Sequence, residues 1–270
     1  MSEPTAEHGK KLEPTRIFFE IPIVHTSESA WVSYTITNPF QNAFSLLLVM
    51  RYLVATGYPS SSGVKTEIVD LTDPTMSCIL EDIPFRYGSA GGLLGTTPVI
   101  CGGYGNGNYL NDCIFYGTSE SISMNAKRRF ASSVTLTNNK LWIMGGRNGN
   151  VWLDSTEFIT TAGTVNGPTL PEVVMASCVV KFPDSGDVYL IGGNTWSGRT
   201  EYTNKVWVAN PTNEYASFTP GPSMMTARSM HGCSTMSIGT KSIIVTAGGE
   251  GYLASIEILD PLSDQWVAGK

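Results

Sequence analysis

VICGGYGNGNYLNDCIFY, residues 99–116, contains an apolar run, a glycine pair, a loop rich in Gly and Asn, and a second apolar run. The loop has some likeness to the dinucleotide-binding fingerprint G-x-G-x-x-G. The third glycine of that fingerprint would have to stand at position 108, which is Asn108. A helix would also have to follow, whereas the sequence continues with a strand-like run. We therefore interpret the stretch as a turn-rich connection between two β-strands.

The same arrangement recurs along the chain, where an apolar run ends in a glycine pair. The runs are YLVATG (a degenerate copy), VICGG, LWIMGG, VYLIGG and IIVTAGG, and their last glycines stand at residues 57, 103, 146, 193 and 249. The spacings of 46, 43, 47 and 56 residues are typical of repeat proteins with periods of about 40–50 residues. Glycine is used where φ is positive or where backbones approach closely. We therefore expect a structural role for Gly57, Gly102, Gly103, Gly145, Gly146, Gly192, Gly193, Gly248 and Gly249.

Each copy contains short strand-like runs separated by turn residues, four to a copy. Upstream of the four glycine pairs, a run carries a small residue at an equivalent position: Ala90, Ser133, Cys178 and Cys233. Downstream of the glycines lie the runs KTEIVDL, NDCIFY, STEFI, NKVWV and SIEIL. No stretch keeps an apolar period of about 3.6 residues, which argues against amphipathic helices. A four-stranded sheet cannot bury both faces alone, whereas sheets packed face to face around an axis can.

These residues resemble the Kelch repeat, in which an apolar strand ends in Gly-Gly and a variable loop leads to a strand followed by an aromatic residue. The segment GPSMMTARSMHGCSTM, residues 221–236, is similar to the consensus that precedes the first strand of a Kelch repeat. The resemblance covers residues 42–268. It implies an all-β fold, a Kelch-type β-propeller with five recognisable four-stranded blades.

Kelch propellers generally close with more blades than the five copies found here. The runs RIFFEIPIV and AWVSYTITN lie where the last two strands of a preceding blade would fall. A partial sixth blade and an incomplete ring are both open. We expect a polar, disordered tail at residues 1–15, a degenerate strand segment at residues 16–41 and the Kelch-repeat propeller at residues 42–270.

The charge and the apolar runs limit the classes of partner. A net charge of -6 and a pI near 5.1 argue against a nucleic-acid partner, which requires a basic face. No apolar run reaches the roughly 18 residues that a membrane-spanning helix needs. The polar N-terminus lacks the apolar region of a signal peptide. We expect neither nucleic-acid binding nor membrane association.

The cysteines and histidines give no sign of a metal or redox site. The five cysteines are an odd number, lie inside apolar runs and never form C-x-x-C, which favours buried free thiols in a reducing compartment. We therefore expect a cytoplasmic protein. The histidines, His8, His25 and His231, are far apart in the sequence. We expect no metal and no cofactor.

A partner-binding face is expected where the loops after the glycine pairs meet the starts of the first strands, because loops on a rigid scaffold usually carry binding residues. Arg128 and Arg228 hold equivalent positions at these starts, whereas Arg86 is displaced by one position. Val173 corresponds to them in the copy that ends at residue 193. Arg, Tyr and Trp dominate binding hot spots. The residues expected on this face are Arg86, Tyr104, Asn108, Tyr109, Arg128, Arg147, Trp152, Trp196, Arg199, Arg228 and Tyr252. The alternative for the arginines is a structural role, as bridges between neighbouring blades.

The resemblance implies a non-catalytic protein-interaction module that binds a peptide or loop of a partner on this face. Its arginines would suit an acidic segment. One alternative is a Kelch-type enzyme of the lyase, mutarotase or oxidase class, with a small-molecule site at the axial mouth. Another is an actin-binding or structural propeller. Many Kelch relatives carry an N-terminal BTB dimerisation domain and act as ubiquitin-ligase adaptors, but the segment before residue 42 is too short for that domain.

Overall fold

The computed structural model describes the backbone of residues 17–25, 28–36, 45–49, 52–56, 66–70 and 79–81, and the backbone and side chains of residues 86–251 and 253–269. The chain divides into two units, Met1–Asn42 and Ala43–Lys270. In the first unit, β1 (Ile17–His25) and β2 (Glu28–Ile36) pair as an antiparallel hairpin. These strands coincide with the two strand-like runs between residues 16 and 41.

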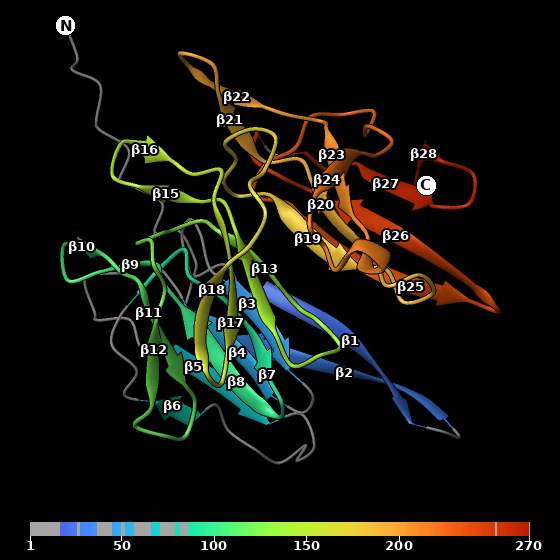
Figure 1. The fold of residues 1–270 in the computed structure, drawn as a ribbon. Helices are drawn as coiled ribbons and strands as arrows, with labels where there is room; N and C mark the ends of the chain where they lie inside the picture. The colour runs from blue at the N-terminus through green and yellow to red at the C-terminus, as the bar shows by residue number, and fades with distance from the viewer. Residues whose placement is uncertain are drawn as a thin grey trace, which may run out of the picture. The chain divides into compact units, whose positions relative to one another are not determined.

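The second unit contains five four-stranded antiparallel sheets, each made by one copy of the repeat (Figure 1). Sheet 1 consists of β3 (Ser45–Val49), β4 (Tyr52–Thr56), β5 (Thr66–Asp70) and β6 (Ile79–Glu81). Sheet 2 consists of β7 (Ala90–Leu94), β8 (Thr97–Cys101), β11 (Asp112–Phe115) and β12 (Ser121–Ser123). Sheet 3 consists of β13 (Ser132–Thr135), β14 (Leu141–Met144), β17 (Thr156–Thr160) and β18 (Gly163–Asn166). Sheet 4 consists of β19 (Cys178–Lys181), β20 (Val188–Ile191), β23 (Val206–Ala209) and β24 (Phe218–Pro220). Sheet 5 consists of β25 (Gly232–Ile238), β26 (Lys241–Ala247), β27 (Ile256–Asp260) and β28 (Gln265–Ala268).

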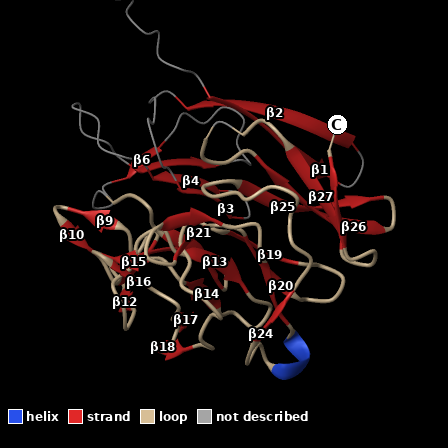
Figure 2. Cartoon of the chain, turned by 90° about the horizontal axis from the view of Figure 1, so that it is seen from above, coloured by secondary structure: helices blue, strands red, loops and turns tan. Residues whose placement is uncertain are grey.

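Strands and loops make up the described chain apart from one short helical turn (Figure 2). This turn is the 3-10 helix Pro211–Asn213, and the side chain of Asn210 caps it by accepting a hydrogen bond from Thr212 N. The all-β class predicted from the repeat is confirmed. Among the described residues, no helix has the length and apolar character needed to cross a membrane.

The first strands of successive sheets lie side by side: β3 beside β7, β7 beside β13, β13 beside β19, and β19 beside β25. Hydroxyl groups join β7 to β13. Ser133 Oγ accepts a hydrogen bond from Gly91 N at 2.9 Å and donates one to Gly91 O at 2.7 Å. Thr135 Oγ1 accepts from Leu93 N at 2.8 Å. An unpaired strand edge exposes backbone groups, and short hydroxyl side chains satisfy that edge here.

Apolar side chains fill the space between successive sheets, because alternate residues of a strand point to opposite faces. In the core between sheets 3 and 4, Trp142 is fully buried. Its ring stacks on Phe158 of its own sheet and on Phe218 of sheet 4, with centroid distances of 5.0 and 5.3 Å. The core between sheets 2 and 3 contains Ala90, Leu94, Val99, Cys101, Cys113, Phe115, Leu141, Ile143 and Ile159.

Glycine pairs sit where one sheet touches the residues that lead into the next. We call the four residues before each first strand its lead-in segment; for sheets 2 to 5 these are residues 86–89, 128–131, 174–177 and 228–231. Gly145 has φ 62°, and a Cβ there would lie 2.3 Å from the carbonyl oxygen of Val174. Gly146 N donates to the same oxygen at 2.8 Å. The residue equivalent to Arg128 and Arg228 is therefore Val174, and the choice of Val173 is wrong by one position.

The glycine pairs of sheets 2 and 4 make the same contact. A Cβ at Gly102 or Gly192 would lie 2.5 or 2.6 Å from the lead-in carbonyl oxygen of the next sheet. The N–H groups of Gly103 and Gly193 donate to those oxygens at 2.8 and 2.7 Å. Only glycine allows this approach, because any side chain would collide with backbone atoms.

Sheet 5 differs at its glycine pair. A Cβ at Gly248 would find its nearest neighbour, the Leu253 carbonyl oxygen, at 3.8 Å. Gly249 still contacts its own lead-in segment, with the Ser229 carbonyl oxygen 3.0 Å from its Cβ position. Gly57 lies outside the described residues.

The lead-in segments are linked to one another by backbone hydrogen bonds. Phe130 N donates to Gly88 O at 2.7 Å, Ala176 N to Phe130 O at 2.8 Å, and Met230 N to Ala176 O at 2.9 Å. Phe130, Ala176 and Met230 have φ values of 55°, 52° and 51°, which are uncommon for residues other than glycine. Because the same uncommon backbone conformation recurs at one position of three lead-in segments, we attribute it to the packing of successive sheets.

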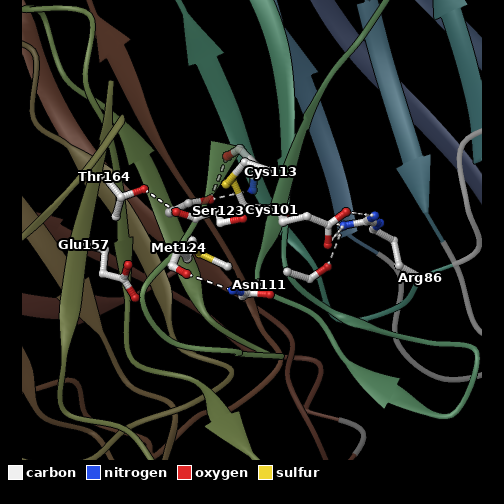
Figure 3. The surroundings of a disulfide bond; sticks show 12 residues. Arg86, Cys101, Asn111, Cys113, Ser123, Met124, Glu157 and Thr164 are labelled. Carbon is white, nitrogen blue, oxygen red and sulfur yellow. Dashed lines mark hydrogen bonds and ion pairs between the residues drawn. A yellow bond between two sulfur atoms is a disulfide. The ribbon is translucent and has the colours of Figure 1, made fainter. Parts of the chain in front are cut away.

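Four of the five cysteines form disulfides, which corrects the expectation of free thiols. Cys101 of β8 bonds to Cys113, which lies directly opposite in β11 of the same sheet (Figure 3). Cys178 of β19 bonds to Cys233 of β25 and so joins the first strands of sheets 4 and 5. Cys78 lies outside the described residues. Because disulfides persist in oxidising compartments, the cysteines do not support the expected cytoplasmic location.

Candidate functional site

Arg128 is buried at the start of sheet 3, with 1% of its surface exposed. Its Nη1 donates to the carbonyl oxygens of Gly145 and Ser155 at 2.7 and 3.0 Å. Its Nη2 donates to the carboxylate of Glu157 on β17. Glu157 is equally buried and also accepts the backbone N–H groups of residues 125 and 126. Burial lowers the pKa of Arg128, and the attraction to Glu157 opposes that change.

Arg228 repeats this arrangement at the start of sheet 5. It is fully buried, and its Nη1 donates to the carbonyl oxygens of Gly248 and Ser255 at 2.8 and 2.9 Å. Its Nη2 donates to Glu257 at 3.0 Å. Glu257 accepts the backbone N–H groups of residues 225 and 226 at 2.6 and 3.0 Å. In both copies the acid follows the arginine by 29 residues.

Arg86 occupies the same place in sheet 2, although the comparison of the repeat copies in the sequence puts it one position away. It is 2% exposed, and its Nη1 donates to Gly102 O at 3.1 Å. Its Nη2 donates to the carboxylate of Asp112 at 2.7 Å (Figure 3). Arg86 stands four residues before β7, as Arg128 and Arg228 stand four residues before β13 and β25.

The assignment of Arg86, Arg128 and Arg228 to the partner-binding face is therefore wrong. Their guanidinium groups are inside the protein, and their Nη groups donate to carbonyl oxygens and carboxylates. Their contacts are structural, as the alternative expected, but they differ from a bridge between two blades. Each arginine attaches its lead-in segment to the sheet that follows it.

Three short hairpins extend from the glycine pairs of sheets 2, 3 and 4 (Figure 1). They are β9 (Tyr104–Gly105) with β10 (Asn108–Tyr109), β15 (Arg147–Asn148) with β16 (Val151–Trp152), and β21 (Asn194–Trp196) with β22 (Thr200–Tyr202). One lead-in residue pairs with each hairpin and adds a third position to it. The resulting rows are Tyr87–Tyr104–Tyr109, Arg129–Arg147–Trp152 and Met175–Asn194–Tyr202. We call these nine residues, together with Trp196, the hairpin layer.

Arg129 is a member of this layer that the sequence analysis missed. Its guanidinium carbon lies over the rings of four aromatic residues, at 4.5 to 5.7 Å from their centroids: Tyr87, Tyr104, Tyr109 and Phe130. Its Nη1 also donates to the hydroxyl of Tyr87 at 2.7 Å. Cation–π contacts of this kind are favourable, and they fix the arginine of sheet 3 against the hairpin of sheet 2.

Trp152 and Trp196 connect the hairpins of sheets 3 and 4. Their ring centroids lie 5.8 Å apart, and Trp196 is 50% exposed. Trp196 lies in a hairpin that has counterparts in sheets 2 and 3.

Asn108 and Arg199 belong to the hairpins but not to the hairpin layer. Asn108 is an exposed residue of β10, and its Nδ2 donates to Asn106 O at 3.0 Å. Arg199 forms an exposed ion pair with Glu201 at 2.5 Å, and its hydrogen bond lowers the pKa of that carboxyl group. Tyr252 lies outside the described residues.

A group of buried polar atoms adjoins the hairpin of sheet 4. Asn194 Oδ1, Ser229 Oγ and both ring nitrogens of His231 have no hydrogen-bond partner within residues 86–251 and 253–269. Burial and the charge of Arg228 lower the pKa of His231 to about 4. The imidazole is thus neutral at pH 7 and offers one donor and one acceptor.

The hairpin layer presents arginine and aromatic groups that are partly open to solvent. Over the part of the chain that the structure describes, no three His, Cys, Asp or Glu side chains come together in a group that could hold a metal ion. No protein-family model matches this chain, and no curated protein matches it.

Proposed function

We propose that the second unit is a Kelch-type β-propeller that binds a segment of a partner protein on its hairpin layer. The repeated sheets, the adjacent first strands and the glycine contacts between successive sheets support this architecture. Each is a feature that stacked blades require.

The observation that carries the binding function is the gathering of aromatic and arginine side chains at one set of hairpins. Trp196 and Tyr202 are 50% and 46% exposed, and Trp152, Tyr104 and Arg147 of the other two hairpins are partly buried. Exposing aromatic surface to water is unfavourable. The same residue types are the usual anchors of protein interfaces.

The layer is also well suited to binding because it is held in place. The lead-in residue of each hairpin exchanges two backbone hydrogen bonds with it, for example Tyr87 with Tyr104 at 3.0 and 2.9 Å. A surface that is ordered before binding loses less conformational entropy when the partner arrives.

A peptide-display selection on the immobilised protein tests the proposal. Affinities of the selected peptides are measured by fluorescence polarisation for the wild type, for Trp196→Ala and for Leu262→Ala. Leu262 is the matched control, since it is 88% exposed and lies outside the hairpin layer. We expect Trp196→Ala to weaken binding by about 30-fold or more, the effect of losing an aromatic anchor, and Leu262→Ala to change nothing. Peptides that bind all three proteins equally would refute the hairpin layer as the site.

A further inference from the structure

Arg129 and Arg147 stand directly opposite each other where the lead-in segment of sheet 3 meets β15. Arg129 N donates to Arg147 O at 3.0 Å, and Arg147 N donates to Arg129 O at 2.9 Å. Two residues that exchange both backbone hydrogen bonds have Cα atoms about 5.5 Å apart and side chains on the same face. Two arginine side chains therefore leave one face of this hairpin from neighbouring positions.

No carboxylate in the described ranges 86–251 and 253–269 compensates these two charges. Every other arginine in these ranges forms an ion pair: Arg86, Arg128, Arg199 and Arg228. The Nε atoms of Arg129 and Arg147 are both buried without a hydrogen-bond acceptor in these ranges, as are those of Arg86 and Arg128, but only Arg129 and Arg147 also lack a carboxylate partner. A buried donor on a charged group is costly when it is unpaired. Like charges directly opposite each other also destabilise a sheet.

The two arginines differ in how far the protein already satisfies them. Arg129 is fixed by the rings around it and by the Tyr87 hydroxyl, which accepts from its Nη1. Arg147 makes no side-chain hydrogen bond, ion pair or ring contact within the described ranges. One arginine is thus held in position, and the Nη groups of the other make no hydrogen bond within these ranges.

We infer that Arg129 and Arg147 together bind the phosphoryl group of a phosphorylated side chain in the partner segment, an inference that rests on the proposed function. A phosphomonoester carries a charge of about -1.5 to -2 at pH 7 and three acceptor oxygens. That charge matches two guanidinium groups, whereas a carboxylate balances one. Arginine is also suited to phosphate because its donors form a planar fork.

The neighbouring tryptophans provide a place for the residue next to the phosphorylated one. Trp152 is the cross-strand neighbour of Arg147 in the hairpin, and Trp196 lies beside Trp152. Cation and aromatic groups therefore follow one another along a single row. A phosphorylated residue followed by an apolar residue fits that order.

The test uses three peptide pools that are degenerate except at a central phosphoserine, serine or glutamate. Affinities are measured for the wild type, Arg147→Gln, Arg147→Lys and the control Arg199→Gln, whose arginine is exposed and paired with Glu201. We expect the phosphoserine pool to bind the wild type at least about tenfold more tightly than the serine pool, as a charge-assisted bidentate contact implies. Arg147→Gln should abolish that preference, Arg147→Lys should keep part of it, and Arg199→Gln should leave it unchanged.

A second readout uses the wild type alone, so that it does not depend on how the variants fold. The Nε–Hε resonances of Arg129 and Arg147 should shift in NMR spectra on addition of the phosphoserine pool, while that of Arg199 stays in place. Equal binding of the glutamate pool would overturn the inference in favour of a carboxylate site. Inorganic phosphate binding as tightly as the peptides would overturn it in favour of a free-anion site. If the serine pool binds as well as the phosphoserine pool and Trp196→Ala weakens both, the phosphate inference fails and the proposed function stands; if no pool binds, the proposed function fails.

Discussion

Arg228→Ala separates a structural from a binding role for the buried arginines. The variant removes the guanidinium that pairs with Glu257 at 3.0 Å and donates to the carbonyl oxygens of Gly248 and Ser255. Glu257 is only 2% exposed. It would keep the two backbone N–H groups of residues 225 and 226 but no opposite charge.

Removal of one partner from a buried ion pair costs about 3–5 kcal/mol of folding free energy. For a unit of this size, 1 kcal/mol corresponds to about 2–4 °C in the melting temperature. Arg228→Ala should therefore melt about 6–20 °C below the wild type in calorimetry or in thermal unfolding followed by circular dichroism. The control Arg199→Ala breaks an ion pair whose arginine side chain is 82% exposed. It should leave the melting temperature almost unchanged, because exposed pairs contribute little.

A double variant shows whether the lost stability comes from the uncompensated charge. In Arg228→Met/Glu257→Gln the site has no charge, and the Gln carboxamide oxygen can still accept from the backbone N–H of Thr226. A buried pair replaced at both positions is often close to neutral in stability, so the double variant should recover much of the loss of Arg228→Ala. The reasoning is refuted if Arg228→Ala melts within about 2 °C of the wild type, since a buried uncompensated charge lowers the folding stability by more than that.

Three further predictions follow from the contacts between sheets. Gly145→Ala should unfold at a lower temperature than Gly248→Ala. Both glycines have positive φ (62° and 70°), but only a Cβ at Gly145 would collide with a carbonyl oxygen, at 2.3 Å. Equal melting temperatures of the two variants would contradict this contact. Replacing Cys178 and Cys233 by Ser opens a loop of 55 residues and should cost about 2–4 kcal/mol in urea unfolding, so a variant as stable as the oxidised wild type would show that the bond is dispensable. His231 has its pKa lowered to about 4 from 6.5, so its contribution to stability is complete above pH 6.5 and is lost as the pH falls towards 4. Between pH 7 and pH 5 the wild type should lose about 2 kcal/mol more than His231→Asn, and parallel losses in the two proteins would disprove the effect.

The four-stranded sheets were predictable because their signals are local. An apolar run, a glycine pair and a turn each occupy a few adjacent residues, and the repetition of the same order removes the ambiguity of a single copy. The sequence also indicated that Cys178 and Cys233 lie side by side, since both occupy the equivalent small-residue position in neighbouring copies. The odd number of cysteines favoured free thiols and so obscured the disulfide. The partner of Cys101 could not be found in this way, because Cys113 belongs to a different strand of the same copy.

The role of the arginines was mispredicted because burial depends on residues far away in the sequence. Arg, taken as a residue type, favours an interface, and nothing within a few positions of Arg128 or Arg228 shows that an acid faces it. A signal was nevertheless present. Glu157 and Glu257 follow the two arginines at an identical separation of 29 residues. A charged pair that recurs at one spacing in a repeat protein indicates a contact inside the repeat unit.

Arg129 was missed for a related reason, since it stands next to Arg128 and successive residues of an extended segment point to opposite sides. The first of the two is buried against its own sheet, and the second joins the hairpin layer. The same pair of positions holds Arg86 and Tyr87 in sheet 2 and Val174 and Met175 in sheet 4. At the first position the backbone contact with the preceding glycine pair is common to sheets 3, 4 and 5, even where no arginine is present. The second position changes from Tyr to Arg to Met, so each hairpin has a different surface while the attachment of one sheet to the next stays the same.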